Sequence, residues 1–169
     1  MKVLIINTGG TFNKEYNPLN GNLEVRKDSK ALEEFLFFCY NLKYKIKNII
    51  SKDSLEMTQD DRKTILDIIK NTKYRNIIVI HGTDTMDLSA DFIAKELEKN
   101  PKNLKKRVIF TGAMLPVSIN KIEANINFSN AIGFFNAKPK NGVYISMHAS
   151  VKNYKKLIKN RSLGQFLEK

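Results

Sequence analysis

A chain of 169 residues, with 42% hydrophobic and 27% charged residues, can bury one substantial core, which suits a folded domain and excludes a disordered chain. The net charge of +12 comes mainly from lysines spread along the chain, so we interpret it as a solvated surface rather than a nucleic-acid groove. The single cysteine, Cys39, excludes an intramolecular disulfide, and we expect it to be a buried helix thiol.

No apolar run approaches the roughly 18 residues of a membrane span. Met1 leads directly into a strand-like run, without a charged and apolar leader. We therefore expect a cytoplasmic protein whose residues 1–169 form a single domain.

Short apolar runs rich in β-branched residues alternate with amphipathic stretches. The apolar runs predict strands at residues 2–7, 45–50, 76–81, 107–111 and 142–147. The amphipathic stretches predict helices at residues 29–42, 58–71, 87–99 and 122–136, the second opening with a capping box of Thr58 and Asp61. This alternation is typical of a three-layer, doubly wound α/β domain.

The segment from Gly10 to Arg26 interrupts this alternation. It is polar and contains Pro18 and the pair Asn20-Gly21, which favours a hairpin turn. We therefore expect a mobile flap directly after the first strand.

Two threonine-bearing turns follow predicted strands: Thr8-Gly9-Gly10-Thr11 and His81-Gly82-Thr83-Asp84-Thr85. The carboxyl ends of parallel strands share one edge of a sheet, so these turns predict a site for chemistry on a small polar molecule. Their glycines lack the spacings of dinucleotide and Walker phosphate loops, and we interpret them as permitting close approach of the backbone. On spacing alone, a plain strand-to-flap turn and a helix cap remain the alternatives.

With two later segments, these turns resemble the bacterial-type L-asparaginase family. The signatures T-G-G-T, D-S-x-x-M, H-G-T-D-T-M and G-A-M-x-P correspond to residues 8–11, 53–57, 81–86 and 112–116. The resemblance covers nearly the whole chain but matches the N-terminal domain of the longer family members. It implies the Rossmann-like N-terminal domain of the asparaginase fold, with the C-terminal domain of those relatives absent.

The resemblance implies an amidohydrolase that converts L-asparagine to L-aspartate and ammonia through a threonine nucleophile and an acyl-enzyme. Thr11 matches the nucleophile, and Tyr16 in the flap matches the lid tyrosine that contacts it. Thr83, Asp84 and a distant lysine match a second hydroxyl-centred triad, in which Asp84 also faces the substrate ammonium. Which threonine attacks first stays open.

The lysine of this triad is expected in a helical or looped segment after the last predicted strand. When Met147 is placed on the family's strand-end methionine, Lys159 comes into register. Lys155 and Lys156 are rivals, because the segment is rich in lysine.

The resemblance also implies how the substrate is held. Ser54 matches the residue that binds the α-carboxylate, and Ala113 would contribute a backbone carbonyl. Leu55 stands where the family often has a polar residue. We expect His81 and His148 to be structural, and we expect neither a metal nor an organic cofactor.

The expected partner is a small amino-acid substrate, with no membrane and no nucleic acid, and the expected assembly is a homo-oligomer, a dimer or a tetramer. Asparagine and glutamine both remain possible substrates. Two other functions stay open: an ammonia-supplying amidase subunit of a tRNA transamidation system, and a non-catalytic amino-acid-binding module. The charge of +12 would suit the first, whereas the retained Thr11, Thr83 and Lys159 argue against the second.

Overall fold

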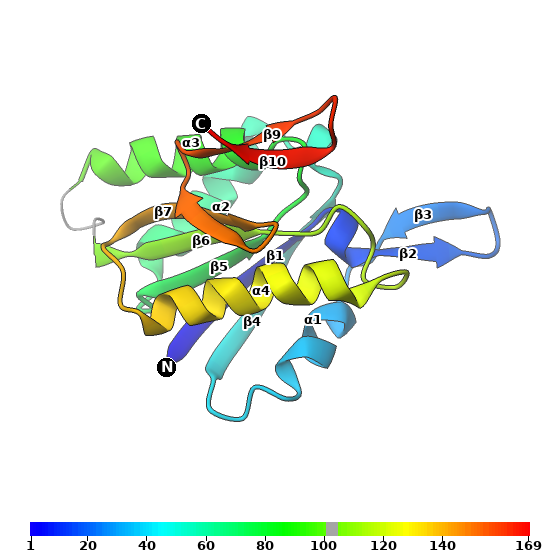
Figure 1. Ribbon diagram of the computed structural model, residues 1–169, viewed down its shortest axis with the longest axis horizontal. Helices are drawn as coiled ribbons and strands as arrows, with labels where there is room; N and C mark the ends of the chain where they lie inside the picture. The colour runs from blue at the N-terminus through cyan, green and yellow to red at the C-terminus, as the bar shows by residue number, and fades with distance from the viewer. Residues whose placement is uncertain (101–104) are drawn as a thin grey trace.

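The computed structural model describes residues 1–100 and 105–169, and its centre is a six-stranded sheet (Figure 1). The sheet has the strand order β4-β1-β5-β6-β7-β8, in which all strands run parallel except the edge strand β8. Its strands are β1 (Lys2–Gly9), β4 (Lys43–Lys52), β5 (Asn76–Ile80), β6 (Arg107–Thr111), β7 (Gly142–Met147) and β8 (Ser150–Asn153). The predicted strands and the doubly wound α/β fold are thereby confirmed.

Helices cover both faces of the sheet (Figure 1). They are α1 (Lys30–Leu36), α2 (Gln59–Asn71), α3 (Met86–Glu98) and α4 (Lys121–Asn136). Successive side chains of a strand point to opposite faces. In β1, Leu4 and Ile6 join the core under α2 and α3, while Val3 and Ile5 join the core under α1 and α4. The central strands β1, β5 and β6 carry continuous apolar runs because both of their faces are buried.

The first helix is shorter than predicted and ends at Leu36 rather than at residue 42. After Leu36 the side chains are no longer buried against the sheet: Phe37 and Phe38 are 68% and 72% exposed. The chain instead turns toward β4, with the Cys39 N–H donating to the Leu36 carbonyl at 2.9 Å. Cys39 therefore lies half-buried in a turn, and the expectation of a buried helix thiol is wrong.

The predicted hairpin after the first strand is present as β2 (Lys14–Asn17) and β3 (Asn22–Val25), which project from the sheet (Figure 1). Gly21 turns the chain with a φ of 75°, where glycine is favoured. At the base of the hairpin, the Asn13 side-chain amide donates to the Arg26 carbonyl at 2.8 Å. This bond fixes the base of the hairpin. Mobility of the hairpin itself stays a prediction.

The chain after β8 forms strands rather than the expected helix or loop. β9 (Leu157–Asn160) and β10 (Gln165–Glu168) pair antiparallel and lie beside α3 (Figure 1). Leu157 and Phe166 enter the core under α3, and this burial selects the extended conformation. In the sequence, the lysines around these two apolar residues hide the strand pattern.

Within residues 1–100 and 105–169, no helix has the length and apolar character needed to cross a membrane.

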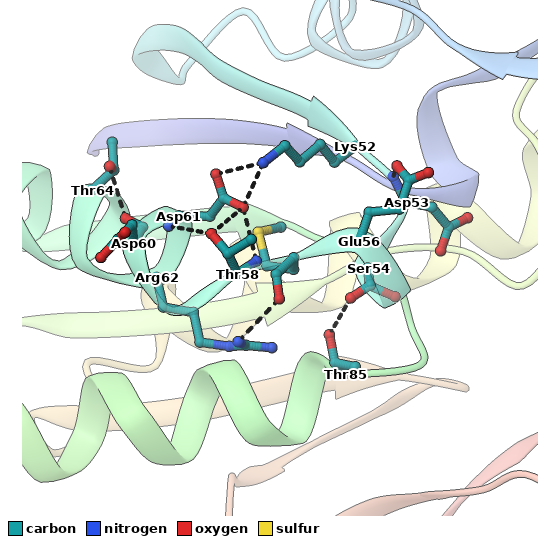
Figure 2. Close-up of polar contacts among 11 residues, drawn as sticks. Lys52, Asp53, Ser54, Glu56, Thr58, Asp60, Asp61, Arg62, Thr64 and Thr85 are labelled. Carbon is teal, nitrogen blue, oxygen red and sulfur yellow. Dashed lines mark hydrogen bonds and ion pairs between the residues drawn. The ribbon is translucent and has the colours of Figure 1, made fainter.

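The capping box predicted at the start of α2 is confirmed. The Thr58 hydroxyl accepts the Asp61 N–H at 3.2 Å, and the Asp61 carboxylate accepts the Thr58 N–H at 2.8 Å (Figure 2). Thr58→Ala should lower the free energy of unfolding by about 1 kcal/mol, because the helix loses its cap. Urea denaturation measures this loss.

Thr64→Ala is the matched control. The Thr64 hydroxyl is exposed and bonds to the Asp60 carbonyl of the same helix at 3.0 Å. Its removal should change the free energy of unfolding by less than about 0.5 kcal/mol. Equal losses in the two variants would contradict the capping role.

Candidate active site

The site lies at the carboxyl ends of β1 and β5, the point where the strand order reverses direction. Thr11 begins a 3₁₀ turn (η1, Thr11–Asn13) directly after β1, and Thr83 follows β5. Both threonine-bearing turns therefore reach the same edge of the sheet, as their positions in the sequence predict.

Glycines bring the turns into backbone contact. A Cβ on Gly10, whose φ is 72°, would lie 2.4 Å from the Cα of Gly82. A Cβ on Gly82 would lie 2.6 Å from the Cβ of Ser54. Such distances are too short for any side chain, so the turns approach this closely only because both positions are glycine.

Lys159 on β9 reaches across to the second turn. Its Nζ donates to the Thr83 Oγ1 at 2.8 Å and to the Asp84 Oδ1 at 2.6 Å. The Lys159 side chain is 8% exposed, while the rivals Lys155 and Lys156 are exposed. The structure thus brings together the threonine, carboxylate and lysine that the resemblance implies.

Arg161, which the sequence analysis did not single out, comes from the turn between β9 and β10. Its Nη2 donates to the main-chain carbonyl of Asp84 at 2.7 Å. The same hairpin therefore holds Asp84 through its side chain, by Lys159, and through its backbone, by Arg161. The sequence offers no signal for this contact, because 77 residues separate the partners.

Ser54 begins a 3₁₀ turn (η2, Ser54–Glu56) after β4 and is buried. Its Oγ accepts the Asp84 N–H at 3.1 Å, and its carbonyl accepts the Thr85 hydroxyl at 2.7 Å; Figure 2 shows the bond to Thr85. Since the Ser54 oxygen accepts here, its hydroxyl proton stays available to an anion. The neighbouring Leu55 is 71% exposed and projects into solvent.

Ion pairs and caps stabilise the Ser54 turn from outside. The Asp53 carboxylate accepts the Leu55 N–H at 3.2 Å and pairs with Lys14 of the flap at 2.6 Å. Burial opposes the charged form, but Lys14 and the Leu55 N–H hold the pKa of Asp53 below its usual value. Lys14 thus links the flap to the Ser54 turn.

Tyr16 belongs to the projecting hairpin of the flap. Tyr16 is 59% exposed on β2, and Thr11 is half-buried. Among the described residues, no hydrogen bond joins the two hydroxyls. The contact of Tyr16 with Thr11 that the resemblance implies therefore stays a prediction.

Ala113 follows β6 at the same edge and is buried. The preceding Gly112 packs closely on the second turn, since a Cβ there would lie 2.4 Å from the His81 carbonyl oxygen. The segment after β6 therefore borders the site.

His81 is fully buried beside these turns and packs edge-on against Phe110 at a centroid distance of 5.8 Å. Its Nδ1 lies 2.7 Å from the Gly82 carbonyl, which can only accept, so Nδ1 carries the proton. Burial lowers the pKa of His81 from 6.5 to about 4, despite this bond. His81 is therefore neutral near pH 7, which agrees with a structural role.

Outside this edge, the described residues offer fewer groups that could take part in catalysis. An open hollow of about 850 Å³ lies between α1 and α4, and Phe35, Phe37, Phe38 and Cys39 contribute to its lining. In the part of the chain that the structure describes, no group of three or more His, Cys, Asp or Glu side chains is arranged to hold a metal. The candidate site is therefore the sheet edge, where hydroxyls, a lysine and carboxylates converge.

Residues 2–164 match the model of the asparaginase N-terminal domain, and the chain belongs to this family. It is 37% identical over 82 residues to L-asparaginase 1 of Escherichia coli (strain K12), a match that covers 47% of this chain and 23% of that protein.

Solved structures share the fold, among them two L-asparaginases. The thermostable L-asparaginase from Thermococcus kodakarensis has a TM-score of 0.81 at 23% identity, over 99% of this chain and 51% of that one. The probable cytoplasmic L-asparaginase from Campylobacter jejuni has a TM-score of 0.71 at 20% identity, over 98% of this chain and 50% of that one. The chain thus spans about half the length of these structures.

Gly10→Ala should destabilise the protein by about 3 kcal/mol or more, because the new Cβ meets the Gly82 backbone at 2.4 Å. Gly21→Ala is the control, since its φ of 75° is similar but nothing lies within 4 Å of its Cβ. Gly21→Ala should lower the free energy of unfolding only by the strain of a positive φ, about 1 kcal/mol. Denaturant unfolding measures both losses, and similar values would show that the contact between the turns matters little.

His81 should make the protein less stable in acid. Between about pH 6.5 and 4 the unfolded chain binds a proton at His81 that the folded chain does not, so stability is present above this window and lost within it. The loss between pH 7.5 and 4.5 should be about 2–3 kcal/mol. Urea denaturation at both pH values measures it.

His81→Asn keeps a donor near the position of Nδ1 but does not titrate, so its acid loss should be smaller by that amount. His148→Asn replaces a histidine whose side chain is 32% exposed and serves as the control. Parallel losses in the wild type and His81→Asn would contradict this account.

Proposed function

We propose that this protein hydrolyses the side-chain amide of L-asparagine to L-aspartate and ammonia. The observation that carries the proposal is the contact of Lys159 with Thr83 and Asp84, at the same sheet edge as Thr11. Membership of the asparaginase family supports the class of reaction.

In the proposed reaction, the Thr11 oxygen attacks the amide carbon and forms a tetrahedral intermediate. The carbon–nitrogen bond then breaks, ammonia leaves with the proton that Thr11 released, and an acyl ester of Thr11 remains. Water adds to this ester, which restores the Thr11 hydroxyl and releases aspartate. Either Tyr16 of the closed flap or Thr83, held by Lys159, transfers the proton.

Backbone N–H groups of the two glycine-bearing turns are suited to stabilise the developing oxyanion. The close contact of Gly10 with Gly82 would keep these turns in place, so that their dipoles need little reorganisation during the reaction. This preorganisation supports catalysis by a hydroxyl that is otherwise a weak nucleophile.

The polar groups around the site suit the ends of asparagine. Ser54 keeps a hydroxyl proton for the α-carboxylate, and the Asp84 carboxylate is suited to the α-ammonium although its Oδ1 already binds Lys159. The Ala113 carbonyl can only accept, so it suits the NH₂ of the side-chain amide. Together these groups would position the amide carbon for attack.

We also propose that residues 1–169 form one domain, because both parts of the core pack on the same sheet. We further propose that the protein forms a homo-oligomer and acts in the cytoplasm. The description of the Campylobacter jejuni relative as probably cytoplasmic supports this location.

Ammonia release from asparagine and from glutamine by the purified protein tests the proposal, with faster release from asparagine expected. Thr11→Val removes the nucleophile and should lower kcat by several orders of magnitude while substrate binding survives. Lys159→Met should also lower kcat strongly, because Thr83 loses its proton partner. The two changes combined should cost much less than their sum, as for residues that act as a unit.

Matched controls sharpen these measurements. Lys156→Met replaces an exposed lysine of the same segment, and Thr64→Val replaces an exposed threonine, so both should keep full activity. Asp84→Asn should weaken substrate binding as well as turnover, because the ammonium loses its counter-charge. Full activity in Thr11→Val would refute the assignment of the nucleophile.

A further inference from the structure

Glu123, in the first turn of α4, binds the backbone of the segment that follows β6. The Glu123 carboxylate accepts the Met114 N–H, with both oxygens at 3.0 Å, and the Leu115 N–H at 3.2 Å. The helix start already has its own cap, because the Asn120 Oδ1 accepts the Ile122 N–H at 2.8 Å. Glu123 is therefore free to bind a loop outside its helix.

This contact determines the direction of the Ala113 carbonyl. In a trans peptide, the C=O of one residue and the N–H of the next point in opposite directions. The Ala113 carbonyl and the Met114 N–H belong to one such unit. Because the Met114 N–H points at Glu123, the Ala113 carbonyl must point away from α4.

The preceding peptide is held from the same helix. Asn127, one helical turn after Glu123 and fully buried, donates its side-chain N–H to the Gly112 carbonyl at 3.0 Å. The Asn127 carbonyl in turn accepts the Ser146 hydroxyl of β7 at 2.7 Å. Both peptides that flank Ala113 are thus fixed from one face of α4.

We propose that Glu123 is a positioning residue that aims the Ala113 carbonyl at the NH₂ of the substrate amide. This inference rests on the proposed function. A carbonyl oxygen accepts from an amide NH₂ but repels the oxygen of a carboxylate. Glu123 would therefore set the preference of the site for the amide substrate over the acid product, which differ at this group alone.

Glu123→Gln tests the inference, because it preserves the shape but loses the carboxylate that accepts from two N–H groups. The KM for asparagine should rise about five- to tenfold, as for the loss of one hydrogen bond, while kcat changes less than about threefold. The inhibition constant of aspartate should change less than about twofold. The ratio of this constant to the KM should consequently fall.

Glu168→Gln is the control, since Glu168 is an exposed carboxylate paired with Lys152 at 3.0 Å, and it should leave both constants unchanged. If the KM for asparagine and the inhibition constant of aspartate rise equally in Glu123→Gln, the substitution has loosened the whole site, and the inference is overturned. Unchanged constants would overturn it as well. If Glu123→Gln does not fold, Glu123→Asp, which keeps the charge but shortens the reach, is measured in its place against the same expectation.

If the wild-type protein releases no ammonia, the proposed function fails, and calorimetric binding of asparagine and aspartate decides the inference by itself. Selective loss of asparagine affinity in Glu123→Gln would support the role of Glu123. Equal losses, no change, or a wild-type protein that binds neither compound would overturn it.

Discussion

The site depends on a contact between two backbones. A Cβ on Gly10 would meet the backbone of Gly82, and a Cβ on Gly82 would meet Ser54, so neither position leaves room for a side chain. A side chain at Gly10 or at Gly82 would force these turns apart. Because the contact is between main chains, it does not depend on the conformation of flexible side chains. Hydroxyls that are distant in the sequence thereby share one edge.

A second constraint is electrostatic. Lys159 places an ammonium in a nearly buried position, where an unpaired charge would be costly. The Asp84 carboxylate compensates it, and the Thr83 hydroxyl accepts another of its hydrogens. Arg161 fixes the backbone of the same turn. The terminal hairpin is thus part of the candidate site, because without it the carboxylate of Asp84 would lose its cation.

The loops of the site are held by side chains that lie outside them. Lys14 of the flap pairs with Asp53 before Ser54, and Glu123 of α4 binds the backbone after Ala113. Such contacts do not touch the reacting atoms, yet they determine where a hydroxyl or a carbonyl points. A site of this kind tolerates little displacement, since positioning contributes much of the rate of enzymatic reactions.

The sequence by itself determined the features that depend on local chemistry. Strands buried on both faces have continuous apolar runs, the Asn20-Gly21 pair turns the flap, and the Thr58–Asp61 box starts a helix, each within a few residues. The strand ends then place Thr11 and Thr83 at one edge, because parallel strands share a direction.

Only the tertiary structure decided the rest. It ended the first helix at Leu36, made the lysine-rich end of the chain into strands around Leu157 and Phe166, and brought Arg161 against the backbone of Asp84. Each outcome depends on contact with a distant element, and the local sequence carries no record of what will cover it.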